Sequence, residues 1–152
     1  MKNRQAGFTL IELVVVIIIL AALAAIALPR YINLGLEARI ASVNAVAGGL
    51  RATVAVVQSR YIVNGNNAAT SVTMLDSTVV TVNALTGIPV GTAAGIGSAL
   101  QAGNNAAPVD GYTTDYAVPT AVTFRITPPN TANCQATYNG TTGAVATDVS
   151  VC

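Results

Sequence analysis

The side chains that could support catalysis are few and widely spaced along this chain. The sequence contains no histidine, and the aspartates lie far apart, at Asp76, Asp110, Asp115 and Asp148. This pattern offers neither a nucleophile beside a base nor a cluster of metal ligands. Asp110 and Asp115 could offer oxygen ligands to calcium, but turn formation explains both more simply. The residue types therefore argue against an enzyme and predict no cofactor and no metal.

Glu12 has the most unusual setting of any ionisable residue in the chain. It is the one charged residue among the 21 from Phe8 to Leu28, which are otherwise almost entirely apolar. A helix of this length rises about 1.5 Å per residue and spans roughly 30 Å, the thickness of a bilayer core. An ionisable group inside such a span is unfavourable and usually has a partner or a task. The run predicts a membrane-spanning helix whose carboxylate has a specific role.

A short basic segment carrying Lys2 and Arg4 precedes the apolar run. The positive-inside bias keeps these charges on the cytoplasmic side and delivers the rest of the chain outside. A secretory signal peptide cut near Ala24 or Ala27, where small residues stand, is the alternative. The early position of Glu12 and the helical pattern beyond these sites favour a span over a signal peptide.

Beyond Pro29 the sequence has the pattern of an amphipathic helix. Its apolar positions recur at alternating steps of four and three residues, which places them on one helix face; they are Leu36, Ile40, Val43, Ala47, Leu50, Val54, Val57 and Tyr61. Pro29 removes a backbone hydrogen bond and predicts a kink or local melting near Leu28. The turn-forming cluster Asn64-Gly65-Asn66-Asn67 predicts the end of the helix. We expect a helix from about Phe8 to Tyr61 with an apolar stripe that packs on a sheet.

The rest of the chain predicts a small β-rich head. Segments with strand character are Ser77–Asn83, Ala121–Thr127, Cys134–Tyr138 and Ala144–Val151, and Thr92–Ala102 has the pattern of a short helix. The last three strand segments predict an antiparallel meander of three or more strands. The fold class is therefore α+β, with a long N-terminal helix packed on a C-terminal antiparallel sheet.

Two features of the last strands predict how they are joined. Asn139-Gly140 is typical of a type I′ hairpin turn, which also explains the glycosylation sequon completed by Thr141. Cys134 and Cys152 are the only cysteines, and an even pair in an exported chain predicts one disulfide. The last hairpin would bring the two cysteines together.

Three segments together resemble a known family. Gly7-Phe8-Thr9-Leu10-Ile11-Glu12-Leu13, after a short basic leader, resembles the processing signal of type IV prepilins. Pro29-Arg30-Tyr31-Ile32-Asn33-Leu34, with Glu37-Ala38-Arg39, resembles pilins of the mannose-sensitive haemagglutinin type. The C-terminal cysteine pair resembles the disulfide-closed region of type IV pilins. Residues 62–120 carry no such resemblance.

The resemblance implies roles for individual residues. A prepilin peptidase would cut between Gly7 and Phe8, and the new amine of Phe8 would be methylated. The family glutamate that matches Glu12 is thought to attract the N-terminal amine of an adjacent subunit during assembly, which would supply the partner that a buried carboxylate needs. Pro29 resembles a family proline near which the helix can melt in the filament.

The sequence thus predicts the precursor of a type IV pilin subunit, made in the bacterial inner membrane and assembled into an extracellular filament. Its partners would be copies of itself, the peptidase and the pilus assembly machinery. The filament would serve adhesion, motility or DNA uptake, although no polybasic patch marks a nucleic-acid surface. Alternatives are a type II secretion pseudopilin, which shares the signal, and a soluble exported binding domain or enzyme. The predicted parts are a leader at 1–7, a transmembrane and filament-core helix at 8–28, an amphipathic helix at 29–63 and a head at 64–152.

Overall fold

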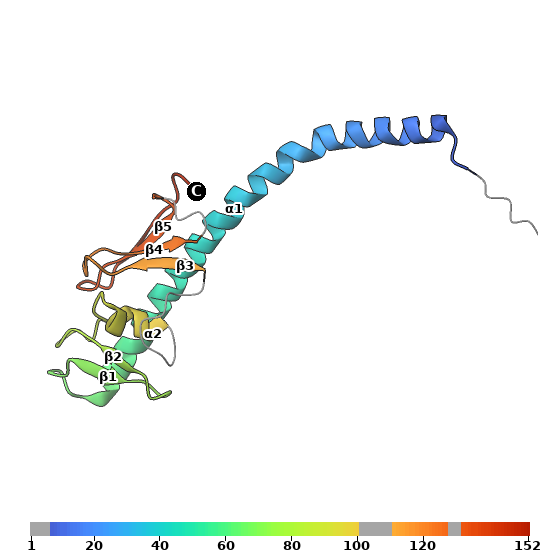
Figure 1. The fold of residues 1–152 in the computed structure, drawn as a ribbon. Coiled ribbons are helices and arrows are strands. Elements are labelled where there is room, and N and C mark those ends of the chain that lie inside the picture. The colour runs from blue at the N-terminus through green and yellow to red at the C-terminus, as the bar shows by residue number, and fades with distance from the viewer. Residues whose placement is uncertain (1–6, 101–110, 128–131) are drawn as a thin grey trace, which may run out of the picture. The chain divides into compact units, whose positions relative to one another are not determined.

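A computed structural model describes residues 7–100, 111–127 and 132–152, with backbone alone at 28–33. The chain divides into two compact units, residues 1–37 and 38–152. Helix α1 (Leu10–Asn64) contributes to both (Figure 1). The observed class is α+β, with a long N-terminal helix followed by antiparallel sheets, as predicted.

Helix α1 is 55 residues long and begins and ends a few residues later than expected. The helix is continuous at Pro29, so of the two effects expected there, a kink or local melting, this structure shows no melting. Loss of one donor leaves the neighbouring backbone bonds intact, and the good helix formers on either side propagate the helix. Gly65 ends it with a positive φ of 67°, and its N–H bonds the carbonyl of Ile62 at 3.1 Å.

The second half of α1 packs its apolar stripe into the head. The buried members of the stripe are Val43, Ala47, Leu50, Val54, Val57 and Tyr61. Ile40 is half-buried, and Leu36 stays exposed. The predicted helix face is therefore confirmed from Val43 onward, because the period of 3.6 residues keeps these side chains on one side.

A four-stranded antiparallel sheet forms the larger part of the head, in the order β3-β4-β5-β6, and Figure 1 labels the first three of these strands. The strands are β3 (Tyr112–Asp115), β4 (Val122–Ile126), β5 (Gln135–Tyr138) and β6 (Val145–Asp148). Phe124 pairs with Ala136 in the centre, and both are fully buried against the helix stripe. The predicted meander is confirmed. Strand β3 was not predicted, because Tyr-Thr-Thr-Asp buries no residue fully and lacks apolar alternation.

A smaller sheet of two strands packs on the end of α1. Strands β1 (Ser71–Thr73) and β2 (Val79–Thr81) pair antiparallel, and Val72 and Val80 join Val57 and Tyr61 in a second core cluster. The sequence predicted β2 with longer bounds and missed β1, whose three residues are too few for a periodic signal. The predicted helix at 92–102 appears as a π-helix, η1 (Ala93–Gly97), followed by α2 (Ser98–Leu100). Its last two residues lie outside the described part.

The turn between β5 and β6 differs from the predicted type I′ turn. Its residue with positive φ is Gly143, at 73°, rather than Asn139 or Gly140. The side-chain oxygen of Asn139 accepts hydrogen bonds from the N–H groups of Thr141 and Thr142, at 2.9 and 3.1 Å. Asn139 therefore forms a side-chain turn. Gly140 is required for a different reason, since a Cβ there would lie 2.1 Å from the nitrogen of Gly91.

Candidate functional site

The bond between Gly7 and Phe8 lies just before α1, in backbone without regular secondary structure. Gly7 is exposed, and the side chain of Phe8 is 87% exposed. A Cβ built on Gly7 would meet nothing within 4 Å in the described part of the chain. The predicted cleavage position is therefore open on the monomer, as exposed non-helical segments at chain ends generally are.

Glu12 is engaged by its own chain. Its Oε2 accepts hydrogen bonds from the backbone N–H and the hydroxyl of Thr9, at 2.9 and 2.7 Å, and the Glu12 N–H lies 3.3 Å from the Thr9 hydroxyl oxygen. This arrangement is a capping box, in which an N-cap threonine and a glutamate three residues later satisfy the free N–H groups of the helix start. Sequence reasoning missed it, although Thr9-x-x-Glu12 carries the signal. The expectation that Glu12 finds a partner only in a second copy is therefore wrong, because Thr9 of the same chain already donates two hydrogen bonds to its carboxylate.

The first half of α1 presents an apolar surface that nothing in its own unit covers. None of the stretch Leu10–Ala27 is buried, and it is long and apolar enough to cross a membrane. The exposed large side chains run from Phe8 to Ile26 and include Leu10, Ile11, Leu13, Val15, Val16, Ile17, Ile18, Ile19, Leu20 and Leu23. A second stretch, Leu34–Asn64, passes the same test but is 28% buried, because one side of it packs into the head.

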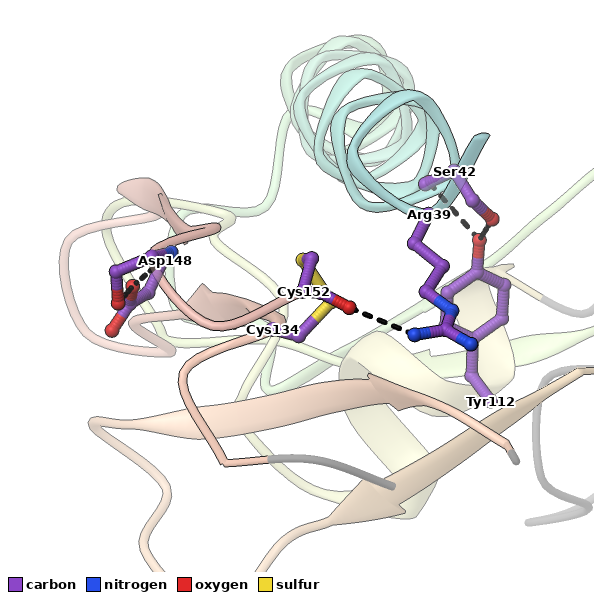
Figure 2. Close-up of a disulfide and its surroundings, with 7 residues drawn as sticks. Arg39, Ser42, Tyr112, Cys134, Asp148 and Cys152 are labelled. Carbon is purple, nitrogen blue, oxygen red and sulfur yellow. Dashed lines mark hydrogen bonds between the residues drawn. A yellow bond between two sulfur atoms is a disulfide. The ribbon is translucent and has the colours of Figure 1, made fainter. Parts of the chain in front are cut away.

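The disulfide ties the end of the chain to the start of β5. Cys134 and Cys152 are bonded to each other, and Cys134 is buried in the main core (Figure 2). Arg39 of α1 donates a hydrogen bond of 2.9 Å from Nη1 to the carbonyl of Cys152 (Figure 2). The covalent closure thus places a backbone acceptor where a helix side chain can bind it.

Polar side chains of α1 hold the head at further points along the helix. Arg51 donates to the carbonyl of Val145 in β6, at 3.1 Å, and Arg60 donates to the carbonyl of Thr73 in β1, also at 3.1 Å. Ser42 and the hydroxyl of Tyr112 share a short hydrogen bond beside the disulfide (Figure 2). The two arginine bonds are charge-assisted and therefore stronger than neutral ones, and they tie α1 to β6 of the larger sheet and to β1 of the smaller one.

The aspartates of the described head form turns. A side-chain oxygen of Asp115 accepts from the N–H of Ala117 at 2.9 Å, and one of Asp76 accepts from the N–H of Thr78 at 3.0 Å; the latter bond lowers the pKa of Asp76. The hydroxyl and N–H of Ser150 donate to Asp148 and likewise lower the pKa of its carboxyl group. Asp110 lies outside the described residues. Within the described ranges no group of three metal-ligating residues comes together.

The chain carries a recognised sequence motif at its N-terminus. Residues 2–28 match the family described as "Prokaryotic N-terminal methylation motif". This motif and the long helix followed by antiparallel sheets define the class: an α+β protein arranged like the type IV pilins.

Named relatives are similar to part of the chain. It is 46% identical over 61 residues to the "Type IV narrow pilus major component PilA5" of Thermus thermophilus, covering 39% of this chain and 53% of that protein. It is 43% identical over 54 residues to the "Type IV major fimbrial protein FimA" of Dichelobacter nodosus, covering 36% and 35% of the two chains. The "Fimbrial protein" of Moraxella nonliquefaciens is 46% identical over 52 residues, or 34% of each chain.

These matches cover about half or less of each relative's own length. No solved structure matches the chain significantly.

Proposed function

We propose that this chain is the precursor of a type IV pilin subunit that polymerises into a surface filament. The observation that carries the proposal is the exposed apolar stretch Leu10–Ala27. It begins at a capping box formed by Thr9 and Glu12, and the same helix continues into a head closed by a disulfide. Burying a large apolar side chain is worth about 1.5 to 3 kcal/mol, so a surface of this size needs a membrane or other copies of the same helix. A structural role, with no enzymatic activity, follows from this reading.

The proposed life of the subunit has two stages. In the first, the leader at residues 1–7 stays on the cytoplasmic side of the inner membrane, and residues 8–28 span the bilayer while the head at 64–152 is delivered outside. In the second, a prepilin peptidase cuts between Gly7 and Phe8, the Phe8 amine is methylated, and the assembly machinery extracts the subunit. Copies related by a non-closing screw operation then form an open filament with the apolar helices in its core.

The start of the mature chain tests the processing step. Intact mass and N-terminal sequencing of the protein from membranes and from sheared surface fibres should give a methylated Phe8 as the first residue. A start near Ala25 or Leu28 would identify a secreted domain released by signal peptidase and would end the proposal. Electron microscopy of the sheared fibres should show filaments whose main band is this chain.

Substitution of the two N-terminal glutamates tests the assembly step. Glu12→Ala should reduce filament yield strongly, because the charged Phe8 amine would enter an apolar core without a counter-charge. Glu37→Ala is the matched control, since Glu37 is exposed on the same helix but outside the apolar run. Filaments from Glu12→Ala at the wild-type level would show that the carboxylate has no part in assembly.

A further inference from the structure

Four large apolar side chains are exposed around the end of α1. Ile62 and Val63 belong to its last turn, Leu75 to the turn between β1 and β2, and Leu85 to the segment after β2. Their exposed fractions are 73, 75, 91 and 81%, whereas no other large apolar side chain in the described part of residues 38–152 exceeds 56%. Scattered apolar residues are normal on a protein surface, but a concentration in one place points to an interaction site. We call these four residues the apolar rim.

Hydrogen bonds fasten the rim to α1. The N–H of Leu85 donates to the hydroxyl of Tyr61, at 2.9 Å. Arg60 donates to the carbonyl of Thr73, at 3.1 Å, just before the turn that carries Leu75. Figure 1 shows β1 and β2 beside the end of α1. The rim is therefore presented on a fixed support.

The two leucines of the rim occupy positions that turn chemistry gives to other residues. Leu85 has a φ of 70°, which glycine and asparagine adopt more easily. Leu75 holds the second position of the turn Met74–Ser77, which is closed by a bond of 3.1 Å from the Ser77 N–H to the Met74 carbonyl. Glycine, proline, asparagine, aspartate and serine are the usual turn residues. Both leucines are exposed, so their own fold gains nothing from them, and such exceptions mark functional positions.

The small size of the rim indicates what kind of partner it can hold. A stable interface between free proteins takes roughly 20 to 30 residues on each side, so four side chains are too few to capture a free partner. They are enough for a partner that another contact already keeps close, because tethering raises the effective concentration. The proposed filament supplies such a partner, since the apolar helices keep other copies of this chain alongside.

The charge of the head also favours a second copy. Residues 38–152 contain four arginines and four aspartates, namely Arg39, Arg51, Arg60 and Arg125 against Asp76, Asp110, Asp115 and Asp148. The two charged residues nearest the rim already bond their own chain, Arg60 to the Thr73 carbonyl and Asp76 to the Thr78 N–H, at 3.1 and 3.0 Å. Heads without net charge meet without mutual repulsion.

We propose that the apolar rim packs on a different part of the head of a neighbouring copy, once the apolar helices have brought the copies together. This inference rests on the proposed function, because the polymer supplies the partner. Rim on rim would join two copies and close, whereas contact between two unlike surfaces repeats along an open filament. The heads thus add cohesion to that of the helices.

Leu75→Asn combined with Leu85→Asn separates this contact from folding. Asparagine suits both turn positions, so the unfolding midpoint of the unassembled full chain in detergent should be no lower than in wild type. Release of subunits from sheared filaments in dilute detergent should nevertheless be about tenfold faster, because two leucines lose their buried contact. Val118→Asn is the matched control, since Val118 is 52% exposed, lies between β3 and β4 outside the rim, and should leave the release rate unchanged.

Photo-cross-linking identifies what covers the rim. Benzoylphenylalanine in place of Leu85, irradiated in sheared filaments, should give a product of twice the subunit mass. Mass spectrometry of that product should find the second peptide within residues 38–152 and outside the rim.

Three results would overturn the inference: release from the double variant at the wild-type rate, a cross-link from rim to rim, or cross-links only to lipid or to a different protein. Each leaves the proposed function standing as long as the wild-type chain forms filaments. If the wild-type chain forms none, the proposed function itself fails, and this inference fails with it.

Discussion

The hydroxyl of Tyr138 donates a hydrogen bond of 2.6 Å to the backbone carbonyl of Pro89, and both residues are fully buried. Tyr138 is in β5, whereas Pro89 lies in the segment after the small sheet and forms an isolated bridge with Val82. This contact links the four-stranded sheet to the segment that follows the small sheet, through a side chain that also fills the main core. Its loss should affect the whole head.

Tyr138→Phe tests this connection. The substitution keeps the ring but leaves the Pro89 carbonyl buried without its donor, and an unsatisfied buried acceptor costs about 1 to 3 kcal/mol. Thermal unfolding of the full chain in detergent, followed by near-ultraviolet circular dichroism, should show a lower midpoint. An unchanged midpoint would mean that the Pro89 carbonyl finds another donor.

The same tyrosine predicts a dependence of stability on alkaline pH. Burial raises the pKa of Tyr138 above its ordinary value of 10.0. Since the folded-state pKa is the higher one, the stabilisation is complete below pH 10 and is lost as the pH rises above it. Unfolding midpoints measured from pH 8 to 12 should fall above pH 10 in wild type. The fall should be shallower in Tyr138→Phe, which has no proton to lose at this position.

Gly140→Ala and Gly49→Ala should have opposite effects. A Cβ on Gly140 would meet backbone atoms of Gly91 and Pro119, which cannot move aside as a flexible side chain does. The expected loss is about 1 to 3 kcal/mol or more. Gly49 lies in α1 with nothing within 4 Å of its added Cβ, so alanine there should stabilise by about 0.5 to 1 kcal/mol. Denaturant unfolding of both variants decides the comparison, and a loss of stability from both would contradict it.

The disulfide should contribute substantially to the stability of the head. Cys134 and Cys152 are separated by 18 positions, and closing a loop of this size is worth roughly 3 kcal/mol. Replacing both cysteines by alanine should lower the unfolding midpoint and also loosen the Arg39 bond to residue 152. A reductant should destabilise wild type to a similar extent and leave the double variant unchanged. Equal sensitivity of the two proteins to reductant would contradict the assignment.

Leu85 occupies a backbone conformation that leucine disfavours. Its φ is 70°, its side chain is 81% exposed, and its N–H bonds the carbonyl of Asn67 and the hydroxyl of Tyr61, at 2.8 and 2.9 Å. Leu85→Asn should stabilise by about 1 kcal/mol, because asparagine tolerates the left-handed region better. Leu75→Asn is the control, since Leu75 is also exposed, at 91%, but has no positive φ. Chemical unfolding should show a gain in the first variant only.

Several features of this protein follow from the sequence alone because their signals are local and repeated. The apolar run is recognised by its length and composition, and the stripe from Val43 to Tyr61 and the strand pattern of β4 to β6 by a periodicity that a few residues already display. The capping box between Thr9 and Glu12 belongs to the same class, since both partners lie within one helical turn. The sequence contained that signal, and reasoning about the charge alone overlooked it.

Other features were decided only by the tertiary structure. The close approach of Gly140 to Gly91 and the bonds from Arg39, Arg51 and Arg60 to distant carbonyls join segments far apart in sequence. Strands β1 and β3 form because a partner strand completes their backbone hydrogen bonds. Backbone acceptors are the same at every residue, so no residue type marks which carbonyl an arginine will reach or which glycine another chain segment will cross. These long-range contacts are determined only when the head packs on the helix.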